Sequence, residues 1–91
     1  MTGKPFQLEI LTPRRIVFRG EVVSLVAPAA EGYLGVLAHH APLIATLTSG
    51  KISYRDPSGT PRVLQATGSG FLEVFQNRAT LLMDEVAEAA A

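Results

Sequence analysis

The chain has 91 residues, of which 47% are hydrophobic and 18% are charged, and its formal net charge is zero. This length leaves room for one small domain. The balanced charge argues against the strongly basic surfaces that bind nucleic acid or anionic lipid, and the absence of cysteine excludes disulfides, thiolate metal sites and cysteine nucleophiles.

Residues 1–5 form a short extension before the first patterned segment. Residues 6–10 then alternate apolar and polar side chains, which is typical of a half-buried strand. Thr12 and Pro13 end this strand, because proline cannot donate a hydrogen bond to a neighbouring strand. The apolar pattern resumes at residues 16–18, so we expect a hairpin or corner between the two segments. No apolar leader follows the start of the chain, and we expect a cytosolic protein.

The middle of the chain combines a β-branched run with an uncharged stretch. Residues 21–27 predict a strand that ends at Pro28. Residues 29–37 alternate glycines with apolar side chains, which favours a shaped surface loop over a strand. No Asp, Glu, Lys or Arg occurs within residues 32–50. The histidines, glycines and Pro42 within that stretch argue against a transmembrane helix.

The second half of the chain predicts five further strands, over residues 43–47, 51–55, 62–67, 71–75 and 79–83. Residues 56–59 match a type I turn, and Gly68-Ser69-Gly70 is expected to break a strand. Regularly spaced strands without helical periodicity predict an antiparallel β-sandwich or barrel over residues 6–84. The Ala-rich tail, residues 85–91, has helix formers for at most a short helix.

The residues offer little material for catalysis. His39 and His40 are adjacent, so in an extended segment they point to opposite faces and do not chelate one metal ion. The Gly68-Ser69-Gly70 segment is followed by a predicted strand, whereas a phosphate loop needs a helix there. We therefore predict no catalytic residue, metal or cofactor. Apolar side chains clustered on a surface loop predict a docking surface, and they are Tyr33, Leu34, Val36 and Leu37.

Several segments together resemble a known family. They are Leu11-Thr12-Pro13, Phe18–Val22, Glu31–Leu37, His40-Ala41-Pro42-Leu43-Ile44, Gly68–Val74 and Ala79–Leu82. Their order and spacing resemble the N-terminal domain of the epsilon subunit of F-type ATP synthases, called delta in mitochondria, over roughly residues 6 to 87. The resemblance implies an all-β fold, a flattened antiparallel β-sandwich of about ten short strands.

The resemblance also implies a role and partners. The family's domain is a non-catalytic rotor subunit that binds the gamma subunit and rests on the c-ring, so that torque from proton or sodium flow reaches the catalytic head. Carried over by position, the residues facing the c-ring and lower gamma are Glu31, Gly32, Tyr33, Leu34, Gly35 and Val36. Those at the gamma contact are His40, Ala41, Pro42 and Leu43. The implied location is peripheral, without lipid insertion, on the cytoplasmic face of the bacterial inner membrane or the matrix or stromal face.

The sequence departs from the family pattern in several places. Tyr33 stands where relatives are often acidic, His39 where glycine is common, and Ser69 where many relatives have a second glycine. Relatives usually continue into a two-helix hairpin that can inhibit ATP hydrolysis, so we expect a subunit that couples without that inhibition. Apart from the resemblance, the alternative is a small β-sandwich interaction or ligand-binding module unrelated to ATP synthase.

Overall fold

The computed structural model describes residues 3–89, and this range contains eight β-strands and no helix. The strands are β1 (Phe6–Leu11), β2 (Ile16–Val22), β3 (Ser24–Ala29), β4 (Gly32–Val36), β5 (Leu43–Leu47), β6 (Gly50–Arg55), β7 (Pro61–Phe75) and β8 (Arg78–Glu88). The all-β prediction is therefore confirmed. Residues 3–89 include no helix of the length and apolar character needed to cross a membrane.

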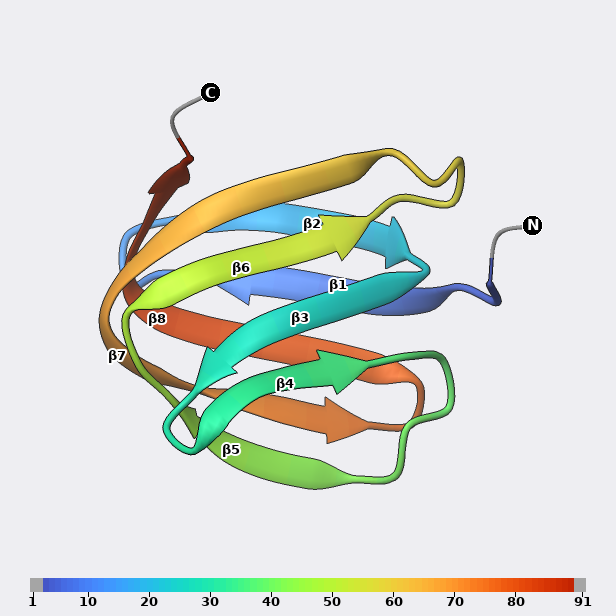
Figure 1. Cartoon of the computed structure of the whole chain (residues 1–91), viewed down its shortest axis with the longest axis horizontal. Helices are drawn as coiled ribbons and strands as arrows, with labels where there is room; N and C mark the ends of the chain where they lie inside the picture. Colours follow the sequence, from blue (N-terminus) through green and yellow to red (C-terminus); the bar gives the residue numbers. More distant parts are fainter. Residues whose placement is uncertain (1–2, 90–91) are drawn as a thin grey trace.

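The strands form two layers joined by β7 and β8. One half of β7, residues 61–66, pairs with β6, and the other half, residues 70–74, pairs with β5. The first half of β8 lies beside β1, and residues 85–88 pair with the first half of β7. Figure 1 shows β3, β4 and β6 in front of β1 and β2. The predicted sandwich is confirmed, although β1 and β8 are parallel to each other.

The core lies between the two layers and follows the period-two pattern of the strands. In β1, Phe6, Leu8 and Ile10 are all buried, while the residues between them are half-exposed. The hydrophobic core draws buried side chains from all eight strands, and no polar or charged residue among residues 3–89 is buried. Burial of apolar side chains from both layers is the main stabilising contribution to a fold of this kind.

Residues 3–89 form eight strands where the resemblance implied about ten short ones, and β7 continues through the glycine-rich segment that was expected to break it. The pairing of β7 with β8 shifts register between Thr67 and Gly70, which is a β-bulge. Gly68 has φ of 92°, a conformation that suits glycine. A Cβ on Gly70 would overlap the carbonyl oxygen of Leu82. The glycines therefore bend one long strand between the layers.

The tail and the segment after Pro28 also differ from the predictions. β8 continues as a strand to Glu88, so the tail, for which at most a short helix was expected, contains no helix up to residue 89, and the boundary placed at residue 84 falls within a strand. Val86 is buried opposite Ala66, so pairing overrides the helix propensity of the tail. Residues 90 and 91 lie outside the described range. The loop predicted over 29–37 contains the strand β4, with Val36 facing the core.

Candidate docking surface

The hairpin formed by β3 and β4 presents only some of its predicted contact residues to solvent. Glu31, Gly32, Tyr33 and Gly35 are exposed. Leu34 is half-buried and packs against the core, and the side chain of Val36 is 2% exposed. Val36 is therefore a core residue whose side chain is not available to a partner. The exposed candidates lie on the turn and on the outer face of the hairpin.

Tyr33 has a structural role besides its exposure. Its hydroxyl oxygen accepts a hydrogen bond from the backbone N–H of Lys51 at 3.1 Å. Next to Tyr33, the backbone N–H of Thr48 donates a hydrogen bond to the carbonyl oxygen of Pro28 at 2.8 Å. The tyrosine ring thus connects β4 to the start of β6 while its side chain stays 62% exposed.

A groove of about 580 Å³ lies between this hairpin and β5. One wall consists of residues 29–34 and the other of residues 43–46, so Glu31 is the one charged residue lining it. A shallower hollow of about 350 Å³ lies next to it on β5 and β7. Leu43 and Ile44 line both depressions. The uncharged stretch of residues 32–50 therefore supplies both β4 and β5 at one continuous surface.

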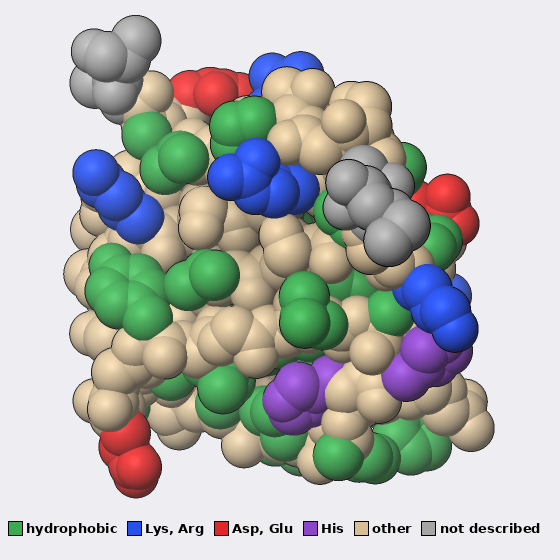
Figure 2. Space-filling view, turned by 45° about the vertical axis from the view of Figure 1, so that its right-hand side comes forward, with side chains coloured by type: hydrophobic (Ala, Val, Ile, Leu, Met, Phe, Trp, Pro, Cys, Tyr) green, Lys and Arg blue, Asp and Glu red, His purple; other side chains and the backbone are tan. Residues whose placement is uncertain are grey.

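The connection between β4 and β5 carries the two histidines and is held by Asn77. His39 has a positive φ of 63°, and its N–H donates to Oδ1 of Asn77 at 2.8 Å. Asn77 also donates from Nδ2 to the carbonyl oxygen of Pro5 at 3.2 Å. Figure 2 shows both histidines at the surface, near hydrophobic side chains, with a Lys or Arg side chain beside one of them. His40 is half-buried, Ala41 and Pro42 are exposed, and Leu43 packs partly against the core.

A row of apolar residues that the sequence predictions missed crosses the outer side of the layer containing β1, β2 and β5, which also carries the charged residues Glu9, Arg19 and Glu73. Cross-strand pairing aligns Phe71 of β7, Leu82 of β8, Leu11 of β1 and Ile16 of β2 in one row. Ile44 is 75% exposed, and Phe75, Phe71 and Ile16 are each about half exposed. We call this the apolar face; its members are Leu11, Ile16, Ile44, Phe71, Phe75 and Leu82.

One sequence signal for this face was present. Residues 71–75 read Phe-Leu-Glu-Val-Phe, so apolar side chains fall on both sides of the strand. Leu72 and Val74 are buried, which leaves Phe71 and Phe75 on the outside. An isolated outward phenylalanine is ordinary, but a row of outward apolar residues marks an interaction surface.

The ionisable groups with displaced pKa values lie outside the predicted contact residues. Burial raises the pKa of Tyr54. Hydrogen bonds from Ser58 and Thr60 lower the pKa of Asp56. Within residues 3–89, no group of three or more His, Cys, Asp or Glu side chains could hold a metal ion. This surface offers mainly apolar contact and backbone hydrogen bonding, with Glu31 and Glu73 as its acidic lining residues.

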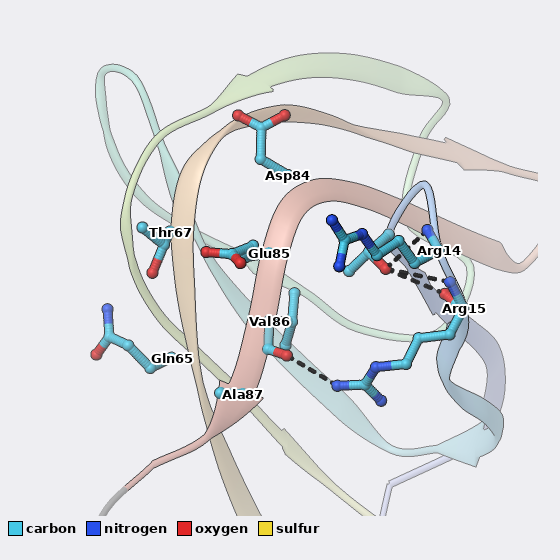
Figure 3. Close-up of a pocket in the computed structure, with 9 residues that line it drawn as sticks. Arg14, Arg15, Gln65, Thr67, Asp84, Glu85, Val86 and Ala87 are labelled. Carbon is cyan, nitrogen blue, oxygen red and sulfur yellow. Dashed lines mark hydrogen bonds between the residues drawn. The ribbon is translucent and has the colours of Figure 1, made fainter.

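A second hollow, of about 430 Å³, lies at the bend of β7 and β8. Figure 3 shows Arg14 and Arg15 on one side of β8, with Thr67 and Gln65 on the other side. Nη2 of Arg15 donates to the carbonyl oxygen of Val86 at 3.0 Å, so this guanidinium ties the β1–β2 turn to β8. The polar side chains do not converge on one point. We interpret this hollow as a structural junction.

Comparison with known proteins decides the family. The family model described as "ATP synthase, Delta/Epsilon chain, beta-sandwich domain" matches residues 5–89. This chain belongs to that family. A relative from Dichelobacter nodosus, named ATP synthase epsilon chain, is 48% identical over 86 residues. The match covers 94% of this chain and 59% of the relative.

Other members of the family differ in length. An ATP synthase epsilon chain from Chlorobaculum tepidum is 43% identical over 85 residues, which cover 93% of this chain and 96% of the relative. Among solved structures, a chain of the Euglena gracilis mitochondrial ATP synthase has a TM-score of 0.87 at 18% identity, covering 97% of this chain and 56% of that one. A chain of the Tetrahymena thermophila central stalk and c-ring structure has a TM-score of 0.76 at 14% identity, with 97% and 69% covered. These two likenesses show the shared fold.

Proposed function

We propose that this β-sandwich is a non-catalytic subunit of the ATP synthase rotor, which docks the gamma subunit to the c-ring. The observation that carries the proposal is the apolar face beside a groove with a single charged lining residue, Glu31, on a chain of the epsilon family. The chain spans 59% of the length of the Dichelobacter nodosus relative. We therefore propose, for this chain, the role of a whole epsilon subunit. Its location is peripheral, on the membrane side that carries the catalytic head.

The two predicted partners use different parts of the surface. Gamma packs on the apolar face and the adjoining residues His40 to Leu43, where burial of Ile44, Phe71 and Phe75 supplies the hydrophobic contribution to binding. The tip of the β3–β4 hairpin, with the exposed residues Glu31 and Gly32, contacts the c-ring. One rigid sandwich that holds both partners makes them turn together.

A pair of variants on one strand tests the gamma contact. Phe71→Glu places a charge on the apolar face, and Val63→Glu places the same charge on the outer side of the other layer. Both side chains are exposed, at 49% and 39%, so both variants retain the core. We expect Phe71→Glu to weaken binding to purified gamma by about tenfold or more, because buried aromatic residues often dominate interface energies. Val63→Glu leaves the affinity unchanged.

Calorimetry and gel filtration at micromolar concentration measure this difference, with circular dichroism to verify folding. The proposal is contradicted if the wild-type chain does not co-elute with gamma. Equal weakening by both variants contradicts the assignment of gamma to the apolar face.

A further inference from the structure

The outer edge of β4 is unpaired. β4 is the last strand in the pairing order and pairs only with β3 among the described residues. An edge strand presents backbone N–H and C=O groups that can pair with another extended segment.

The orientation follows from Pro28, the β3 residue opposite Tyr33. The carbonyl oxygen of Pro28 accepts a hydrogen bond from Thr48, so the backbone of Pro28 faces away from β4. In antiparallel pairs, residues directly opposite each other either bond to each other or both face away. Tyr33 therefore directs its N–H and C=O outward. Gly35, two residues further along, does the same, because the direction repeats with period two.

β2, the strand at the other end of the pairing order, has features that discourage pairing with a further strand, and β4 lacks them. β2 is paired with β1 through a register shift near Ile16, and Arg19 on β2 forms an ion pair with Glu9. Bulges and charged side chains are common devices that discourage pairing at sheet edges. The five residues of β4 include no charge and no proline, and a Cβ on Gly35 would meet nothing within 4 Å. The edge of β4 is therefore open to a strand.

We propose that an extended segment of the gamma subunit adds to the outer edge of β4, with hydrogen bonds to the backbones of Tyr33 and Gly35. This inference rests on the proposed function and specifies how gamma is held. The groove between the hairpin and β5 is continuous with the apolar face through Ile44. A gamma segment on β4 thus extends the same interface. Glu31 is the one charged residue lining the groove, and Glu73 lines the adjoining hollow.

Amide hydrogen exchange on the whole chain tests the proposal directly. The isotope-labelled chain is measured alone and with excess unlabelled gamma by NMR. We expect exchange at Tyr33 and Gly35 to slow by about tenfold or more in the complex, because these amides gain partners. Leu34, whose N–H faces β3, serves as the internal control and changes much less.

A matched pair of substitutions at one position adds an affinity measurement. Gly35→Pro removes the outward N–H, and proline is accepted on edge strands. Gly35→Ala keeps that N–H and places its methyl group in open space. We expect Gly35→Pro to weaken gamma binding by about tenfold and Gly35→Ala to leave it within about twofold.

Several results would overturn the proposal. In a complex that forms normally, unchanged exchange at both amides contradicts strand addition while leaving the docking function intact. Protection that appears in the chain alone as its concentration rises assigns the edge to a second copy. Protection that requires the c-ring assigns it to that partner. Failure of the wild-type chain to bind gamma contradicts the docking function itself.

Discussion

His39 shows how one residue bears a conformational cost within the candidate surface. Its φ of 63° lies in the left-handed region, where a residue with a Cβ is disfavoured by about 1–2 kcal/mol. Glycine removes that cost, but its greater freedom in the unfolded state lowers stability by about 0.5–1 kcal/mol. We therefore predict that His39→Gly raises the free energy of unfolding by about 0.5–1 kcal/mol.

Thermal unfolding measures this change as a rise in Tm of a few degrees. His40→Gly is the control, because His40 does not have a positive φ, and it is expected to lower Tm. A lower Tm for His39→Gly would show that the imidazole ring contributes more than the backbone strain costs.

Asp56 makes the stability of the β6–β7 turn depend on pH. Its Oδ1 accepts hydrogen bonds from the Ser58 hydroxyl at 2.5 Å, the Ser58 N–H at 2.9 Å and the Thr60 N–H at 3.0 Å. These bonds lower the pKa of Asp56 from 3.8, so the folded state favours the carboxylate. The stabilisation is present above the unfolded pKa and is lost as pH falls through the lower folded value.

We predict that the Tm difference between wild type and Asp56→Asn is constant near neutral pH and shrinks below about pH 4. Thermal unfolding across this pH range measures it. A difference that stays the same down to about pH 2 would contradict the hydrogen-bonded carboxylate as its source.

The bend of β7 and β8 depends on glycine because two backbones approach closely there. A methyl group at residue 70 would overlap the Leu82 carbonyl, which belongs to the partner strand and cannot rotate away. We predict that Gly70→Ala lowers the free energy of unfolding by about 3 kcal/mol or more. Chemical denaturation measures this loss. Gly35→Ala, in open space, stays within about 0.5 kcal/mol, and a similar loss in both variants would contradict the explanation.

The strands that alternate clearly were predictable, and those whose form depends on distant partners were not. Residues 6–10 alternate cleanly and form most of β1. β4 was predicted as a loop, because its glycines suggested a turn and its pairing with β3 is not visible in local pattern. The tail was expected to favour a helix because local propensity does not include the pairing of Val86 opposite Ala66.

The candidate surface was predictable only where it follows from a local sequence pattern. The uncharged stretch of residues 32–50 contains β4 and β5, and residues of both strands line one groove. It did not show that Val36 is buried, because which side of a strand faces the core depends on the second layer. The row of Phe71, Leu82 and Ile16 needs the order of four strands, which no local pattern gives.

At the scale of the whole molecule, one small sandwich carries two adjacent surfaces. The apolar face lies on the layer of β1, β2 and β5, and the hairpin tip lies beside it across the groove. Under the proposed function, a rigid body that binds gamma on one surface and the c-ring on the other transmits torque between them.

The central claim is that this chain couples gamma to the c-ring, and ion pumping measures that coupling directly. ATP synthase depleted of its epsilon chain is reconstituted into vesicles, and ATP-driven ion uptake per ATP hydrolysed is compared after adding back the wild type, Phe71→Glu or Val63→Glu. We expect the wild type and Val63→Glu to restore coupled uptake, and Phe71→Glu to restore several-fold less at equal concentration. Uptake that is unchanged by the wild-type chain, or restored equally by all three, would contradict that claim.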